Sequence, residues 1–331
     1  MKLGFFAYLL FFYSCLMGQA SVPPDSSVSS KVSFFQPSPY LNKTRFYGMA
    51  ALGVATYSTA TVALYNSWYR DYPMGDFRLF NDNREWLQMD KAGHVFSSYF
   101  QTAYSCDVAR WTGLSKKHSL ITGAAIGLLS QTTIEVMDGF STQWGFSIGD
   151  ISANLAGAAL FVGQEWWLDQ QIVFIKESSL PVRYDKSHLN AVGGGAYSTL
   201  ERRATELFGP GLLERALKDY NVQTYWASID IKSLTHIKAW PSWLNIALGL
   251  GAQNLYGGFE NKWTEGDATY DLNSVMPRYR QYYLSLDINW RKIRTKNHLV
   301  NGIFNGLNIF KMPAPAIEYS NKEWSFHLLF W

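Results

Sequence analysis

The sequence has little cysteine and little charge. Its 331 residues include two cysteines, and Cys15 falls within the apolar N-terminal segment. If that segment is cleaved after Ala20, Cys106 is the one cysteine left, which excludes an intramolecular disulfide and a cysteine metal cluster. Charged residues make up 17% of the chain, against roughly 25% in an ordinary soluble domain. The formal net charge of +3 gives no support for nucleic-acid binding.

Aromatic residues, by contrast, are abundant at 16%, within a hydrophobic share of 47%. This composition excludes an intrinsically disordered chain. Low charge with many aromatic side chains is typical of a protein in or at a membrane. The mean hydropathy of −0.12 argues against a standard multi-span transporter.

The first 42 residues predict an exported protein. Residues 1–20 start with Lys2, continue as an apolar run and end in small residues, as a secretory signal peptide does. An uncleaved N-terminal anchor is the alternative, and the residues before Cys15 make a poor lipobox. Residues 21–42 are rich in serine and proline and are typical of a leader or linker.

Residues 43–169 predict a four-helix bundle, with helical patterns over 43–70, 86–112, 117–140 and 148–168. Residues 46–69 form an uncharged run long enough to span a membrane, but the other uncharged runs are shorter, which favours helices packed together. Frequent glycine and alanine in 123–127 and 153–159 would let helix backbones approach closely, in a membrane or in a soluble core.

Residues 170–331 predict a β-rich region, with one further helix near 198–219. Polar and apolar residues alternate over 225–232, 244–251, 282–291 and 324–331, which is typical of half-buried strands. Strands of this length, and a chain that ends in an aromatic residue, resemble those of outer-membrane barrels, although six or seven candidates fall short of the usual 8. The predicted class is therefore α+β: a helical bundle followed by an antiparallel β region, either packed on the helices or part of an outer-membrane barrel.

The strongest chemical pattern begins at Asp90, Lys91 and His94. Because residues at i and i+4 share a helix face, the Asp90 carboxylate and the His94 imidazole can meet. A carboxylate beside an imidazole fixes its tautomer and raises its basicity, as in a general base or a metal ligand.

Two further helices carry polar residues on one face. Glu135 and Asp138 lie at i and i+3, and Ser147 precedes Asp150 and Asn154. Each has a structural alternative, since Ser147 and Asp150 resemble a capping box and Asp90 suits a helix N-terminus. Polar groups inside an apolar bundle are costly unless they have partners, so their convergence indicates a site.

These residues resemble two families. Asp90-Lys91-x-x-His94, then Glu135, then the serine, aspartate, asparagine and glycine in 147–157 resemble the VanZ-like pattern. Residues 82–165 resemble an uncharacterised family described as predicted periplasmic lipoproteins, and 219–226 and 241–245 resemble its long Bacteroidetes-type members. The resemblance implies an envelope protein with no agreed biochemical activity. VanZ-like proteins are integral membrane proteins associated with tolerance to glycopeptide antibiotics.

Three functions remain open for a protein of the outer membrane or facing the periplasm. The first is binding of a membrane lipid or envelope component in a polar-lined helical cleft, where Asp138, Ser147 and Asn154 would contact the ligand. The second is hydrolysis of a lipid or polyprenyl phosphate, which would use the candidate catalytic residues Asp90, Lys91, His94, Glu135 and Asp150. The third is a buried polar network with a structural role alone. The sequence specifies neither a metal nor a cofactor.

Overall fold

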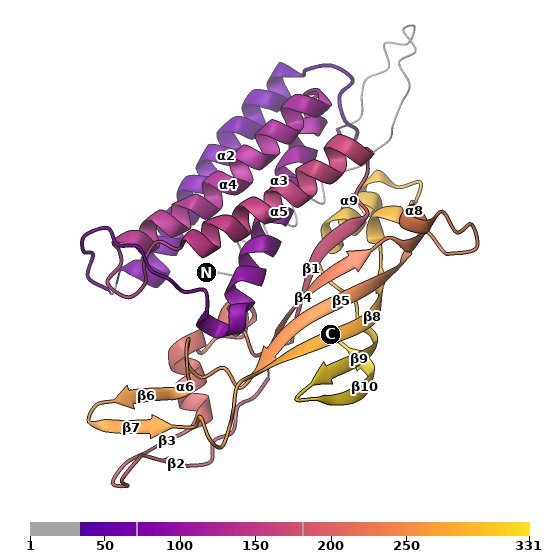
Figure 1. Ribbon diagram of the computed structural model, residues 1–331. Coiled ribbons are helices and arrows are strands. Elements are labelled where there is room, and N and C mark those ends of the chain that lie inside the picture. Colours follow the sequence, from indigo (N-terminus) through magenta and orange to yellow (C-terminus); the bar gives the residue numbers. More distant parts are fainter. Residues whose placement is uncertain (1–33, 71, 181) are drawn as a thin grey trace, which may run out of the picture. The chain divides into compact units, whose positions relative to one another are not determined.

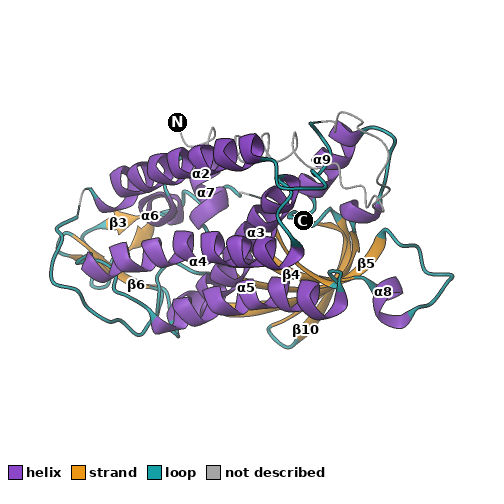
Figure 2. Cartoon of the chain, turned by 90° about the horizontal axis from the view of Figure 1, so that it is seen from above, coloured by secondary structure: helices purple, strands orange, loops and turns teal. Residues whose placement is uncertain are grey.

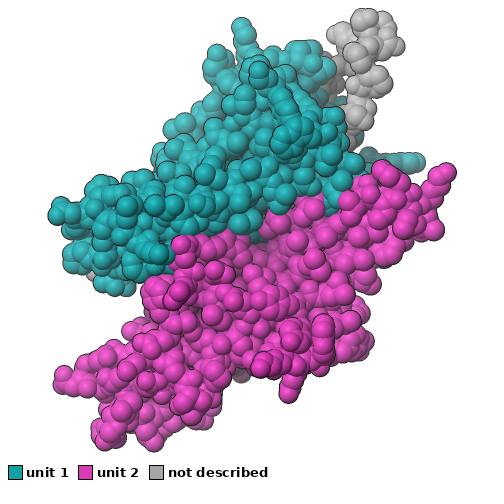
Figure 3. Space-filling model, in the orientation of Figure 1, with its two compact units in different colours: residues 1–82, 94–172, 289–309 teal, residues 83–93, 173–288, 310–331 magenta. Residues whose placement is uncertain are grey.

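The protein is described by a computed structural model that covers residues 34–70, 72–180 and 182–331. The expected signal peptide, its cleavage site and residues 21–33 of the leader lie outside this range. Contacts divide the chain into two units (Figure 3). Unit 1 contains the described residues up to 82 together with 94–172 and 289–309, and unit 2 contains 83–93, 173–288 and 310–331.

Unit 1 is helical (Figures 1 and 2), which confirms the helical part of the predicted fold class. Its long helices are α2 (Lys43–Leu64), α3 (Met89–Trp111, whose first turn falls in unit 2), α4 (Lys116–Phe140) and α5 (Ile148–Leu168). Its shorter helices are η1 (Tyr65–Tyr69), η3 (Trp290–Lys292) and α9 (His298–Leu307). Side chains of Asn42, Ser115 and Ser147 cap α2, α4 and α5 by accepting backbone N–H groups.

Glycines let three of these helices approach closely. A Cβ atom at Gly157 on α5 would lie 2.3 Å from the Val95 carbonyl oxygen on α3. On α4, a Cβ at Gly127 would meet Thr102 of α3 at 2.5 Å, and one at Gly123 would meet the Thr102 carbonyl oxygen at 2.6 Å. The small residues therefore permit the tight crossings that the sequence predicts.

The outer surface of unit 1 is apolar. Helix α2 buries no residue, and α4 has the length and composition of a membrane span, with 28% of its apolar stretch buried. Among the described residues, α4 is the one helix that meets these criteria, which by itself is weak evidence for a span. The large exposed apolar side chains on α2, α4 and α5 include Val54, Val62, Ile121, Ile126, Leu129, Leu155 and Trp167.

Unit 2 is built on a six-stranded antiparallel sheet in the order β1-β4-β5-β8-β9-β10. Its strands are β1 (Val173–Ser179), β4 (Gln223–Ile229), β5 (Leu244–Gln253), β8 (Tyr279–Ile288), β9 (Ala314–Ser320) and β10 (Glu323–Phe330). The described strands form no closed barrel, although Lys311 N donates to the carbonyl oxygen of Glu177, within β1, at 3.0 Å.

Smaller elements complete unit 2. They are η2 (Glu85–Gln88), two ribbons, β2 (Leu189–Asn190) with β3 (Tyr197–Ser198) and β6 (Lys262–Glu265) with β7 (Ala268–Asp271), and the helices α6 (Leu200–Phe208), α7 (Leu212–Lys218) and α8 (Ile231–Thr235). The single helix expected near 198–219 is two helices, because Gly209 adopts a φ of +88° and Pro210 follows it.

The sheet exposes apolar side chains and buries polar ones. Leu248, Leu284, Ile317 and Phe326 are in register across four strands, and each is between 42% and 67% exposed. On the opposite face, the row of Ala247, Ser285 and Ala316 is buried. The strands are half-buried as predicted, but on β8 the buried half is the polar half.

Hydrogen bonds and ion pairs satisfy this polar face. Lys176 Nζ lies 2.7 Å from Asp287 Oδ2, and neither side chain is exposed. Ser228 donates to the same carboxylate at 2.6 Å, while Glu318 accepts from Gln281 at 2.8 Å and lies 2.7 Å from His327. The buried face of the sheet therefore contains two polar clusters, one around Asp287 and one around Glu318, each held by close contacts.

Candidate functional site

His94, in the second turn of α3, is oriented by Asn154 of α5. Its Nδ1 lies 3.1 Å from Asn154 Oδ1. Because an amide oxygen can only accept, Nδ1 must carry the proton and donate it to this bond. The bond therefore fixes the ring, and Nε2 is the nitrogen that faces the carboxylates of α4 and α5.

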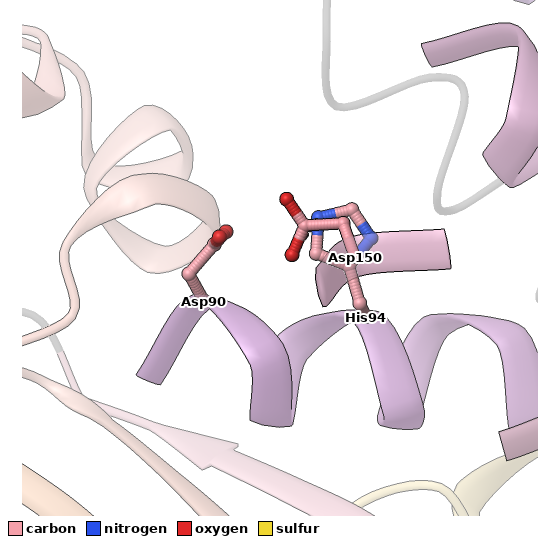
Figure 4. Close-up of side chains that lie close together, drawn as sticks. All are labelled: Asp90, His94 and Asp150. Atoms are coloured by element: carbon pink, nitrogen blue, oxygen red, sulfur yellow. Dashed lines mark ion pairs between the residues drawn. The ribbon is translucent and has the colours of Figure 1, made fainter. Parts of the chain in front are cut away.

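Two buried carboxylates lie at equal distances from Nε2. Glu135 Oε1 on α4 and Asp150 Oδ1 on α5 are each 3.6 Å away. Figure 4 shows Asp150 beside the His94 ring. The carboxyl side chains are 1% and 6% exposed, and that of His94 is 15% exposed. A charge-assisted hydrogen bond is usually about 2.7–2.9 Å long, so this imidazole is near both carboxylates without close contact.

Ser147 holds the two acids in place. Its hydroxyl accepts the Asp150 N–H at 3.0 Å, and its own N–H donates to Glu135 Oε2 at 3.2 Å. The Ser147 hydroxyl also donates to Asp82 Oδ1 at 2.6 Å. Ser147 therefore caps α5, but the Ser147 N–H donates to Glu135 on α4 and not to the Asp150 side chain, so only one half of the expected capping box forms. Asp82 had no motif spacing to indicate this contact and is 7% exposed.

Asp90 and Lys91 lie one turn before His94 on α3. A carboxylate oxygen of Asp90 lies within 4.8 Å of a ring nitrogen of His94, as the i, i+4 spacing predicts. Asp90 also accepts from Tyr220 at 2.9 Å and forms a 3.0 Å ion pair with Lys91. Tyr220 was not predicted as a site residue, although it lies in the segment 219–226 that carries part of the family resemblance.

Asp138 has a different partner. It accepts a 2.6 Å hydrogen bond from the Tyr69 hydroxyl in η1. Burial and the neighbouring Asp138 carboxylate raise the pKa of Tyr69 well above its usual value, so this phenol stays a donor. The bond ties the end of α4 to η1.

The donors around His94 suit a divalent cation. An imidazole nitrogen and carboxylate oxygens are common zinc ligands, with bonds of about 2.0–2.2 Å. At those lengths two ligands of a tetrahedral ion are about 3.4 Å apart. The separation of 3.6 Å from Nε2 to Asp150 Oδ1 is close to that value, and the residues whose ligand atoms all lie within 4.8 Å of one another are Asp90, His94 and Asp150. Asp90, which precedes His94 by one turn, offers another carboxylate on the same helix.

The fold and site define a mixed helix and sheet protein with a buried histidine–carboxylate cluster. Residues 76–163 match the model of a family described as predicted periplasmic lipoprotein, whose function is unknown. This confirms the predicted resemblance for that segment, which contains all eight candidate site residues. It supports a location in the periplasm, within the cell envelope. Searches of curated proteins and of solved structures found no match. The VanZ-like resemblance stays a prediction.

Proposed function

We propose that the protein is a membrane-associated protein of the cell envelope that binds a ligand at the His94 cluster. The observation that carries this proposal is the position of His94 Nε2, 3.6 Å from both Glu135 and Asp150. Carboxylates gathered around one imidazole are ligand types that a divalent cation takes in proteins. Titratable groups that cluster in this way are found preferentially at functional sites.

A divalent cation fits these ligand types, and it would also serve as a contact for an anionic group. The bound envelope component would then be a lipid or another molecule with a phosphate or carboxylate, held through the cation. The partly exposed edge of His94 gives such a group access to the site.

The sheet of unit 2 supports membrane association. Its apolar face is exposed on β5, β8, β9 and β10, whereas its buried face contains a Lys176–Asp287 ion pair. In water the hydrophobic effect favours the opposite arrangement, and proteins that face lipid have apolar residues outside and polar residues inside. Strands β5 and β8 have 10 residues each, within the range of about 9–11 that crosses a bilayer. We therefore assign this face to contact with lipid, in the outer membrane.

Binding is better supported than hydrolysis of a lipid phosphate. The hydrolase alternative requires Lys91 as a phosphate contact, but Lys91 Nζ lies 3.0 Å from Asp90 Oδ2. The Asp90 carboxylate therefore offsets the positive charge of Lys91 that a phosphate group would need for binding.

Zinc titration of the purified full chain in detergent tests the site. We expect one high-affinity ion per wild-type chain and at least about tenfold weaker binding for His94→Gln and Asp150→Asn. His118→Gln is the matched control, because His118 is exposed on α4 and contacts Ser115. Equal zinc binding by all variants would contradict the proposal. Mass spectrometry of copurified lipid, with a lipid-phosphate turnover assay, then identifies the envelope ligand and tests hydrolysis.

Cosedimentation with lipid vesicles tests the membrane-facing sheet. Phe326→Asp places a charge on the apolar face and should lower vesicle binding at least about fivefold. Val275→Asp is the control, since Val275 is 70% exposed in a loop of unit 2 outside the sheet. If both variants bind vesicles as the wild type does, the sheet does not face lipid.

A further inference from the structure

Unit 2 contains a pocket of its own, with a volume of about 520 Å³. It lies between the turn that precedes α3, the loop around Glu260 and the start of β8. Pockets for small molecules usually measure about 300–1,000 Å³. Neither the candidate site nor the family match gives this pocket a role.

The charge of the pocket is positive. Arg84, Arg278 and Arg280 line it, with Glu260 as the one carboxylate among the lining residues. Guanidinium groups therefore outnumber carboxylates among the lining residues, and each guanidinium carries a positive charge. A pocket of this kind attracts anions.

Hydrogen bonds hold two of these arginines without neutralising them. Arg278 donates to the carbonyl oxygens of Gly257 at 3.1 Å and Gly258 at 2.7 Å. Arg280 donates to the Leu87 carbonyl oxygen at 3.2 Å and to the Gln88 side chain at 3.0 Å. These acceptors are neutral, so both guanidinium groups keep their charge. Burial lowers the pKa of Arg278, which means that its charge is held at a cost that an anion would reduce.

A strained turn forms one wall of the pocket. Trp86, Leu87 and Gln88 have φ values of 48°, 50° and 68°, in the left-handed region. This conformation costs roughly 1–2 kcal/mol for each non-glycine residue. Trp86 N donates to the Gly258 carbonyl oxygen at 2.7 Å, and Arg280 bonds the next two residues. Strain that several contacts enforce is often found at functional sites.

We propose that this pocket binds the phosphate group of a phosphate monoester. A monoester carries about −1.5 to −2 charges at pH 7, which suits a pocket lined by three guanidinium groups. Guanidinium groups bind phosphate oxygens in bidentate geometry. The volume exceeds that of a phosphate group, so part of the esterified alcohol also fits. A lipid headgroup and a soluble metabolite share this chemistry.

Equilibrium dialysis of the full chain in detergent, with glycerol 3-phosphate as the probe, tests the proposal. We expect the wild type to bind glycerol 3-phosphate, and glycerol should not compete for the pocket. Arg84→Glu should bind at least about tenfold more weakly. Arg84 is the residue to change because it is exposed and contributes charge without a structural bond that would endanger folding. Arg183→Glu is the control, because it makes the same charge change at an exposed position of unit 2 outside the pocket, and it should alter binding less than about twofold. His94→Gln should leave this binding unchanged, which separates the pocket from the His94 site.

Vesicles separate the two sources of the phosphate. If the ligand is a lipid headgroup, the protein should bind phosphatidylcholine vesicles that contain phosphatidic acid more tightly than vesicles of phosphatidylcholine alone. Arg84→Glu should weaken this preference. Binding of glycerol 3-phosphate without any preference for phosphatidic acid would assign a soluble ligand. The proposal is overturned if the wild type binds neither probe, or if Arg84→Glu and Arg183→Glu weaken binding equally.

Discussion

Buried charge is arranged differently in the two units. In unit 2, Lys176 and Asp287 lie 2.7 Å apart with no exposure, and Ser228 completes the contact. In unit 1, His94 Nε2 lies 3.6 Å from each of two carboxylates, and its ring is partly exposed. Close and complete pairing fixes a structure, whereas charge held at longer range can accept a ligand. The difference separates a structural network from a candidate binding site.

The largest effect is expected at the buried ion pair of unit 2. Lys176→Met removes the cation that lies 2.7 Å from the buried Asp287 carboxylate, and should lower the free energy of unfolding by about 3–5 kcal/mol. The control Lys262→Met removes a surface lysine that lies 3.7 Å from Asp271, and should cost no more than about 1 kcal/mol. Denaturant unfolding of the full chain measures both. Similar losses in the two variants would mean that burial does not distinguish the pairs.

Glu177 on β1 is an exception within unit 2, because burial raises its pKa to about 8 from the ordinary 4.5. A raised pKa means that the folded state holds the proton more tightly. The stabilisation is complete below pH 4.5 and is lost as the pH rises through about 8. The free energy of unfolding of Glu177→Gln should therefore equal that of the wild type near pH 4.5. Above about pH 8 it should exceed the wild-type value by up to about 4 kcal/mol. If the variant and the wild type differ in free energy of unfolding by the same amount at pH 4.5 and above about pH 8, Glu177 does not titrate in this way.

The close crossing of α3 and α5 brings the site of unit 1 together. Gly157→Ala would place a Cβ atom 2.3 Å from the Val95 carbonyl oxygen and should cost about 1–3 kcal/mol by forcing the helices apart. Gly53→Ala on α2 meets nothing within 4 Å, so the better helix propensity of alanine should stabilise the chain by about 0.5–1 kcal/mol. Thermal unfolding compares the two. A neutral Gly157→Ala would show that the crossing is not tight.

The smallest stability change is expected at His94. His94→Gln should alter the free energy of unfolding by about 1 kcal/mol or less while it weakens zinc binding at least about tenfold, since the imidazole is 3.6 Å from both acids. A loss as large as that of Lys176→Met, with no ligand bound by the wild type, would instead support the purely structural role of the cluster. Chemical denaturation in the presence of a chelator measures the free energy of unfolding without any contribution from bound zinc.

Some of the site could be predicted from helical spacing. Asp90 and His94 meet because i and i+4 share a face, and Asp150 and Asn154 follow the same rule on α5. Asp82 could not be predicted, because it reaches Ser147 through a loop 65 residues away in sequence. Asp138 shares a helix with Glu135, yet its partner is Tyr69, a choice that no spacing rule contains.

The left-handed turn before α3 was also beyond sequence rules. A helical pattern over 86–112 predicts a start at Trp86, but α3 begins at Met89. Three consecutive non-glycine residues rarely adopt a positive φ, and contacts with Gly258 and Arg280 are needed to hold them there. Local preference was overridden by tertiary hydrogen bonds.

The sequence by itself determined the class of the fold, the positions of the long helices and the existence of the alternating strands, because these follow from local periodicity. Alternation separates two faces of a strand but does not say which face is covered. Tertiary structure alone decided that the polar face of the sheet is buried around Lys176 and Asp287, and that α3, α4 and α5 bring two acids to His94. Both outcomes depend on contacts between segments far apart in the chain, whose energies no local pattern contains.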